Sequence, residues 1–215
     1  MLIDLSHPIE HGMITYAGLP APVISDFLTR ENSRSRYADG TEFHIGRIDM
    51  VANTGTYLDT PSHRFENGAD ISMIPLEAVA GLQAVMLRAS GRSIDAAAVA
   101  DVDLRGKAVL IHTGWSRHWR TETYWNNQHP FVSRGAAEKL ANSGVRVVGI
   151  DSYNIDDTAD LTRPAHTILL RAGIFIVEHL TNLESLPDSA AIRFFAVPPK
   201  VRGLGTFPVR AFAMV

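Results

Sequence analysis

The sequence contains no cysteine, which excludes disulfides, thiol nucleophiles and thiolate metal sites. It also lacks any run of about 18 apolar residues, the length that a transmembrane helix requires. The formal net charge is only −3, so there is no electrostatic reason to expect nucleic acid or an anionic membrane as a partner. Asp4 interrupts the apolar segment that an export signal would need. We therefore expect a cytoplasmic protein.

The chain that remains has the composition of an ordinary globular protein. It has 215 residues, of which 46% are hydrophobic and 20% charged, enough to bury a substantial core. We find no internal repeat and no low-complexity segment, so residues 1–215 are expected to form a single domain.

Hydrophobic periodicity predicts an α/β fold with a β-rich N-terminal arm at residues 23–50. Alternating apolar and polar residues in the arm are typical of strands, and Asp39-Gly40 is a turn signal between them. Apolar runs at 108–112 and 145–150 flank a helix that Ser133 can cap and Gly144 can end, which predicts a βαβ unit with parallel strands. The other expected strands are 2–5, 83–88, 174–177, 194–197 and 208–213, and the other expected helices are 71–80, 95–101 and 164–173.

The segment from Asn53 to His63 concentrates polar and titratable side chains between a glycine and a proline. Gly55 and the threonines beside it are poor helix formers, so we expect an extended segment in which alternate side chains share one face. Asn53, Tyr57 and Asp59 then point the same way. A carboxylate and an imidazole directed at one point can form a metal site or an acid/base pair. The alternative is a polar turn that satisfies its own backbone.

Two loops add candidate substrate contacts. Tyr16 lies in a proline-rich loop near the N-terminus, and Trp115 and Trp119 follow the carboxyl end of the strand at 108–112. Ligands of α/β folds bind at such strand ends, in pockets rich in aromatic side chains. The alternative is that the tryptophans cover the edge of the core. Glu178 closes another apolar strand, where a buried charge needs a partner.

The segment Asn53 to His63 resembles the cyclase-family motif His-x-Gly-Thr-His-x-Asp-x-Pro-x-His, found in bacterial kynurenine formamidases and isatin hydrolases. The resemblance continues along the whole chain, through the segments Asp4 to Ile9, Thr113 to Trp115, His129-Pro130, Val148 to Asp151, His166 with Glu178, Asn182-Leu183 and Pro208 to Arg210. It implies a swivelling β/β/α fold with a mixed central sheet and flanking helices. It also implies a homodimer or homotetramer and the hydrolysis of an amide or related acyl bond of a small molecule by metal-activated water.

By position, the family's metal ligands fall on five residues, and His63 falls on its proton-shuttling histidine. Those five are Asn53, Tyr57, Asp59, His166 and Glu178. Both motif histidines are therefore replaced, and asparagine and neutral tyrosine are poor ligands of zinc. The resemblance implies that one metal of the two-metal members is absent here, whereas Asp59, His166 and Glu178 could hold one zinc or manganese ion.

Three interpretations of the site follow. In a hydrolase, Asp59 or a bound cation positions water, His63 is the acid/base, Tyr57 donates to a developing oxyanion, and Asn53 contacts the substrate. The protein could instead bind a small ligand without turnover, or it could be a metal-free lyase or cyclase that uses Tyr57 and His63. The sequence leaves the substrate open.

Overall fold

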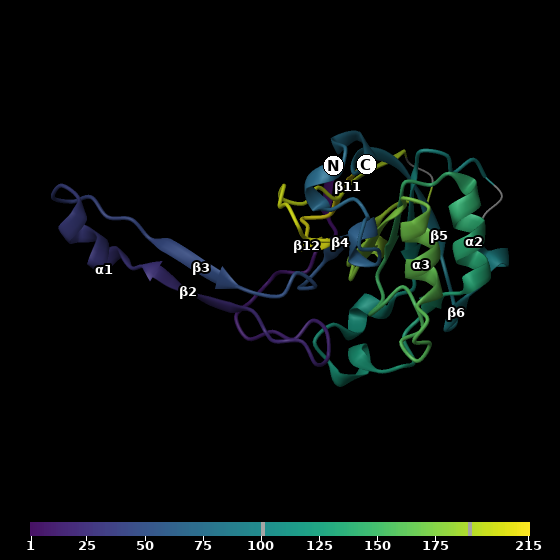
Figure 1. The fold of residues 1–215 in the computed structure, drawn as a ribbon, viewed down its shortest axis with the longest axis horizontal. Coiled ribbons are helices and arrows are strands. Elements are labelled where there is room, and N and C mark those ends of the chain that lie inside the picture. The colour runs from purple at the N-terminus through teal and green to yellow at the C-terminus, as the bar shows by residue number, and fades with distance from the viewer. Residues whose placement is uncertain (100–101, 189–190) are drawn as a thin grey trace.

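The computed structural model describes residues 1–99, 102–188 and 191–215 and is built on a curled, mixed nine-stranded sheet (Figure 1). The strand order is β1-β13-β11-β5-β7-β9-β10-β4-β12. The strands of this sheet are β1 (Leu2–Asp4), β4 (Tyr57–Asp59), β5 (Ala80–Arg88), β7 (Ala108–His112), β9 (Val147–Ile150), β10 (Phe175–Glu178), β11 (Ile192–Phe195), β12 (Thr206–Pro208) and β13 (Phe212–Met214). The predicted α/β fold with a mixed central sheet is confirmed.

The middle of the sheet is parallel and contains the predicted βαβ unit. Strands β5, β7, β9 and β10 run parallel to one another. Helix α2 (Arg134–Ser143) connects β7 to β9; the Ser133 hydroxyl caps its N-terminus, and it ends at Gly144, whose φ is 75°. Such a left-handed C-terminal residue costs little only for glycine. The capping serine and the terminal glycine predicted from the sequence therefore mark the two ends of α2 in the structure.

Two apolar cores lie on opposite faces of the sheet. Helices α2 and α3 (Pro164–Arg171) lie side by side over one face (Figure 1). They bury Leu140 and Leu169 against Val109 and Val148 of the parallel strands. On the other face, side chains such as Leu58 and Phe194 pack in a second cluster enclosed by the curled sheet itself. The sheet is thus held from both sides, which fixes the ends of its strands.

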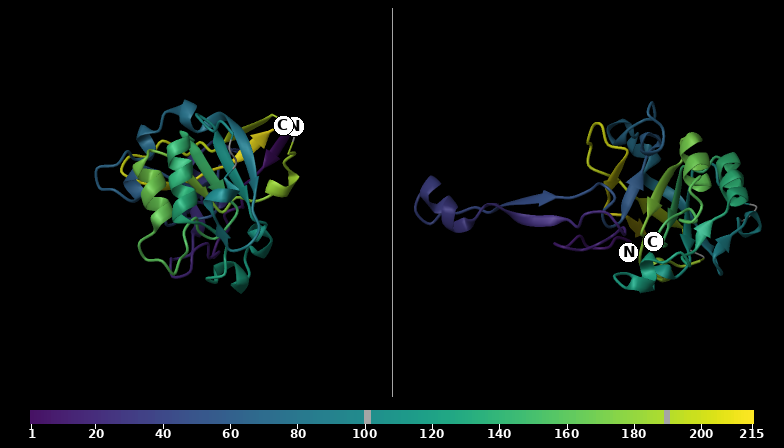
Figure 2. Two further views of the ribbon diagram at one scale, coloured as in Figure 1. Left: turned by 90° about the vertical axis from the view of Figure 1, so that its right-hand side faces the viewer. Right: turned by 60° about the horizontal axis from the view of Figure 1, so that its bottom comes forward.

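The arm is an isolated ribbon that extends away from this body (Figures 1 and 2). It consists of β2 (Val23–Leu28) paired antiparallel with β3 (Ile45–Asp49), with the short helix α1 (Arg30–Ser33) at its tip. All five residues of β3 are exposed, as are five of the six in β2. The predicted β-rich arm is confirmed, although α1 was not predicted.

Several predicted elements differ in detail from the structure. The helix expected at 71–80 is replaced by two single turns, Ile71–Met73 and Leu76–Ala78, after which β5 begins at Ala80. Pro75, which lacks a backbone N–H, separates the two turns. The helix expected at 95–101 is a turn at Ala96–Ala98, and its last two positions lie outside the described residues. The strand expected at 208–213 is two strands, β12 and β13. A further short parallel pair joins β6 (Ser93–Ile94) to β8 (Phe131–Val132).

Among residues 1–99, 102–188 and 191–215, no helix is long and apolar enough to cross a membrane.

Candidate active site

The site is centred on β4, a three-residue strand held between β10 and β12. Its register places Tyr57 opposite Glu178 and Asp59 opposite Thr206. Directly opposed residues on one face lie close enough for side-chain contact. The Tyr57 hydroxyl donates to Oε2 of Glu178 at 2.6 Å, and the Thr206 hydroxyl donates to Oδ1 of Asp59. Strand pairing therefore generates two of the contacts on which the site depends.

His166 enters the site from the first turn of α3 and is oriented by Asp156. One oxygen of Asp156 accepts from the backbone N–H of Ala165, and the other accepts from the Nδ1–H of His166 at 2.7 Å. Asp156 thus caps the helix and fixes the imidazole tautomer at once. The remaining nitrogen, Nε2, lies 3.6 Å from Oδ2 of Asp59 and 3.7 Å from Oε1 of Glu178.

His63 is brought to the site by a single turn, Pro61–His63, that begins directly after β4. A side chain at Gly205 would place its Cβ 2.3 Å from the backbone nitrogen of His63, so only glycine allows this turn to approach β12. Nδ1 of His63 lies 2.8 Å from the Thr206 hydroxyl. Because that hydroxyl gives its single proton to Asp59, His63 must donate its Nδ1–H to it. The lone pair at Nε2 of His63 is left free for chemistry.

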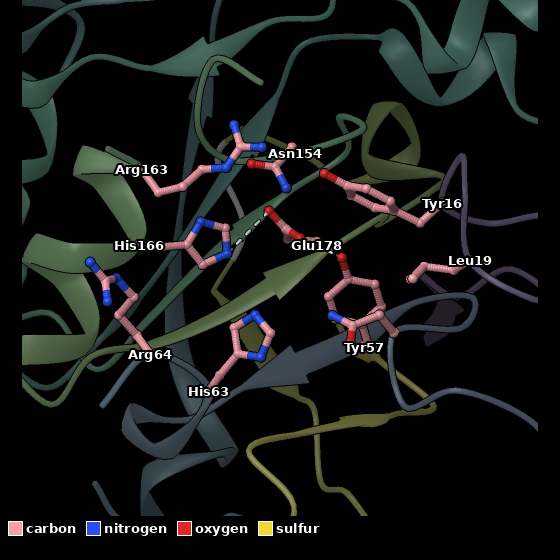
Figure 3. Close-up of a pocket in the computed structure, with 10 residues that line it drawn as sticks. Tyr16, Leu19, Tyr57, His63, Arg64, Asn154, Arg163, His166 and Glu178 are labelled. Carbon is pink, nitrogen blue, oxygen red and sulfur yellow. Dashed lines mark hydrogen bonds and ion pairs between the residues drawn. The ribbon is translucent and has the colours of Figure 1, made fainter. Parts of the chain in front are cut away.

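These groups line a cavity of about 270 Å³ (Figure 3). Its lining includes four side chains that the sequence predicted for the substrate or the chemistry, Tyr16, Asn53, Tyr57 and His63. The predicted metal ligands His166 and Glu178 also line it, and the other lining residues are Leu19, Arg64, Asn154 and Arg163. Asp59 lies beneath them, fully buried.

The two tryptophans predicted to bind substrate lie outside this lining. Trp119 stacks on the His7 ring, with the centroids 3.9 Å apart, and Nε1 of Trp115 donates to the backbone carbonyl of Tyr124. Asp151 accepts backbone N–H groups of Thr113 and Gly114 and so anchors the start of the tryptophan loop. Substrate binding by Trp115 and Trp119 stays a prediction.

The electrostatics of the site are dominated by buried charge. Burial opposes the charging of His166, but the carboxylates of Glu178, Asp156 and Asp59 outweigh it and raise its pKa to about 10. Burial, together with the charge of Asp59, raises the pKa of Glu178 to about 7. The pKa of Asp59 is lowered despite its burial, because the imidazoles of His63 and His166 stabilise the carboxylate.

The donor atoms fit a divalent cation. Oδ2 of Asp59 is buried without any hydrogen-bond partner and faces Nε2 of His166. Two ligand atoms each about 2.1 Å from a tetrahedral ion lie about 3.4 Å apart, close to the separations observed. The Nδ1–H of His166 is held by a carboxylate, as is usual for a metal-ligating histidine. Asp59, His63 and His166 offer atoms within 4.8 Å of one another, and Glu178 adjoins His166 from the other side.

Sequence reasoning missed Asp156 and Thr206, which touch the predicted residues from other elements. Asp156 precedes a helix by several residues, so its capping role depends on a loop conformation that the sequence does not specify. Thr206 is placed by strand register. The position of Asp156 in the loop after a buried strand could have marked it as a candidate site residue. No local pattern in the sequence marks Thr206.

The fold and the site define a class of protein: α/β proteins with a buried carboxylate–imidazole site, suited to a divalent cation, at one end of a mixed sheet. Within that class, the family model described as "Putative cyclase" matches residues 3–157. The match covers well over half of the chain, which therefore belongs to the cyclase family.

Curated relatives and solved structures agree with this assignment. The chain is 29% identical over 211 residues to a kynurenine formamidase of Geobacillus thermodenitrificans, covering 97% of this chain and 95% of that one. A structure described as a potential metal-dependent hydrolase with cyclase activity matches with a TM-score of 0.79 at 30% identity, over 99% of this chain and 96% of that one. Isatin hydrolase A from Labrenzia aggregata, bound to benzyl benzoate, shares the fold with a TM-score of 0.82 at 22% identity, covering 100% of this chain and 93% of that one.

We predict that Thr206→Val randomises the His63 tautomer, whereas Thr206→Ser does not. The valine leaves a buried oxygen of Asp59 and the Nδ1–H of His63 without partners, and we expect it to lower the free energy of unfolding by about 1–3 kcal/mol. Ring ¹⁵N chemical shifts of His63 report the tautomer, and urea unfolding reports stability. Identical His63 spectra in the valine and serine variants would refute the role assigned to the hydroxyl.

We also predict that cation-free protein loses stability as the pH rises from about 6.5 to about 10. His166 titrates near 6.5 when unfolded and at about 10 when folded, so the folded state retains a proton that the unfolded state has released. The stabilisation is complete below the lower value and lost through the upper one. Urea unfolding in the presence of chelator should show this fall in the wild type and a flatter profile in His166→Gln. Parallel profiles would contradict the assignment.

Proposed function

We propose that this chain is a hydrolase that cleaves a non-peptide C–N bond, in an amide, formamide or cyclic amide, or the related bond of a lactone. The observation that carries the proposal is the buried, unpartnered Oδ2 of Asp59, which faces Nε2 of His166, a residue that lines the cavity. The relatives support it, since they are kynurenine formamidases and isatin hydrolases.

We propose one divalent cation, zinc or manganese, held by Asp59, His166 and Glu178. Carboxylates and a neutral imidazole suit either ion. When bound, such an ion polarises a carbonyl and lowers the pKa of a water molecule. Asp156 keeps Nε2 of His166 directed at Asp59 and Glu178, and Tyr57 fixes the orientation of Glu178.

The chain's own groups can carry the proton through the reaction. His63 has its lone pair at Nε2, since Nδ1 donates to Thr206, so it can accept a proton from water as the oxygen adds to the carbonyl carbon. The C–N bond then breaks, and His63 returns the same proton to the leaving nitrogen. The products are a carboxylic acid and an amine. About one third of the His63 side chain is exposed (35%), which gives it access to the cavity.

The hydroxyl of Tyr57 argues against the lyase or cyclase alternative. It is buried and already donates to Glu178, and burial with the charge of that carboxylate raises its pKa well above the usual value. Such a group is a poor acid or base at neutral pH. Its expected role as an oxyanion donor stays a prediction, as does the cytoplasmic location.

We predict hydrolysis of at least one member of a panel of aryl formamides, cyclic amides and lactones when zinc or manganese is supplied. His63→Gln should lower kcat by about 100- to 10,000-fold, the usual contribution of a general acid/base. His44→Gln is the matched control, because His44 lies on the arm and pairs with Asp26. Progress curves identical to buffer across the panel would favour a binding protein without turnover.

We further infer that the arm packs against a second copy of this chain in a homodimer or homotetramer. An isolated two-stranded ribbon is only marginally stable in water. This ribbon exposes large apolar side chains, among them Phe27 at 70%, Phe43 at 52% and Ile48 at 48%. Several large apolar side chains exposed on one short ribbon are typical of an interface.

Replacing Phe27 and Ile45 together by serine should therefore lower the mass measured by light scattering to that of the monomer. Leu76→Ser is the matched control, because Leu76 is an apolar residue of the body with a similar exposure of 65%. A wild-type protein that is monomeric at micromolar concentration, or a double variant of unchanged mass, would rule out this role of the arm.

A further inference from the structure

Two arginines, Arg64 and Arg163, line the cavity on either side of His166 (Figure 3). Both are held in place by neutral oxygens. Nε of Arg64 donates to the Thr167 hydroxyl at 3.2 Å, and Nη1 of Arg163 donates to the backbone carbonyl of Asp157 at 2.9 Å. Each guanidinium retains donors that these contacts do not use.

Of the fifteen other arginines, six form ion pairs with carboxylates of the described residues, one of them the longer contact of Arg30 with Glu42 at 3.8 Å. The other five ion pairs measure 2.6–2.7 Å, namely Arg34 with Glu42, Arg88 with Asp188, Arg92 with Asp157, Arg120 with Glu10 and Arg210 with Asp4. Within the described part of the chain, Arg64 and Arg163 have no such carboxylate partner. The cavity lining therefore contains two guanidinium groups that no ion pair neutralises.

The two acidic residues nearest to Arg163 in the sequence form no ion pair with it, although, beside the hydrogen bonds from Thr162, the charge of Arg163 helps to lower the pKa of Asp160. Asp157 pairs with Arg92, and Asp160 accepts hydrogen bonds from the backbone and hydroxyl of Thr162. Arg163 itself adopts the left-handed conformation, with φ 47° and ψ 62°, directly before α3. This conformation is costly for a residue with a side chain and persists where the surroundings enforce it, often at functional sites. Here it accompanies the placement of the guanidinium at the cavity.

The carboxylates behind His166 carry the opposite charge to the arginines. The carboxylates of Asp59 and Glu178 are buried there, with exposures of 0% and 1%. In the cation-free protein a negatively charged part of a ligand is disfavoured beside them, and beside the arginines it is favoured with or without the cation, because bidentate hydrogen bonds to a carboxylate are possible there. The uncharged amide of the same ligand can then lie at His63 and His166.

We propose that Arg64 and Arg163 bind a carboxylate of the substrate, so that the substrate class is small anionic amides. The assignment of a substrate class rests on the proposed function. The anion-binding site itself depends only on the two arginines. Arg163 is the main contact, because its backbone and Nη1 are both fixed, and Arg64 assists from the other side of His166.

Binding tests the anion site without turnover. Isothermal titration calorimetry of the full-length protein with anthranilate and with aniline compares two ligands that differ by the carboxylate. We expect the wild type to bind the anion at least about tenfold more tightly. Arg163→Gln and Arg64→Gln should each remove most of this preference, whereas Arg163→Lys should keep part of it. Arg171→Gln is the matched control, because Arg171 lies on α3 outside the cavity lining.

Turnover tests the substrate class. N-formylanthranilate and formanilide are the corresponding amides, and we expect the two glutamine variants to lower kcat/KM about 10- to 100-fold for the anionic amide, with little change for the neutral one. An anion preference that the arginine variants abolish, in a protein that hydrolyses neither amide, would support the anion site while the proposed hydrolase fails. Equal binding of both ligands by the wild type, or a preference unchanged in both variants, would overturn the inference.

Discussion

The site depends on the pairing of one buried strand of three residues, β4, with β10 on one side and β12 on the other. Leu58 points into the core, whereas Tyr57 and Asp59 point to the opposite face, as strand geometry requires. A shift of one residue in either register would place Leu58 in the site and two polar groups in the core. Packing of the core therefore determines where the polar groups lie. The turn at Pro61–His63 follows the same strand, so its position depends on that strand too.

Charge balance is the second constraint. Asp59, Asp156 and Glu178 are fully buried or nearly so, and burying a carboxylate without compensation costs several kcal/mol. Backbone and hydroxyl donors satisfy most of their oxygens, and the exception is Oδ2 of Asp59. The cluster therefore requires positive charge at that oxygen, from a divalent cation or from the imidazolium of His166. A site with this requirement is well suited to gain or lose an ion without refolding the strands around it.

The sequence predicted what local patterns encode and missed what distant strands bring together. Alternation and capping residues were enough for the arm, the βαβ unit and the ends of α2. The resemblance to a family motif supplied Asp59, His63, His166 and Glu178 as a set. Thr206 could not be found, because it meets Asp59 only through the register of β12, about 150 positions along the chain. The two arginines were missed because the sequence does not show which of its arginines line the cavity.

The replacement of the two motif histidines is physically consistent with the rest of the structure. The Tyr57 hydroxyl donates a hydrogen bond to Glu178 and so stabilises part of the negative charge that a second cation would otherwise offset. Asn53 is uncharged and lines the cavity, where it adds hydrogen-bonding capacity without positive charge. Positive charge available to a ligand lies in the cavity lining, at Arg64 and Arg163. Guanidinium groups in the cavity wall favour a ligand that carries negative charge, and they leave the chemistry to the groups around Asp59, His63 and His166.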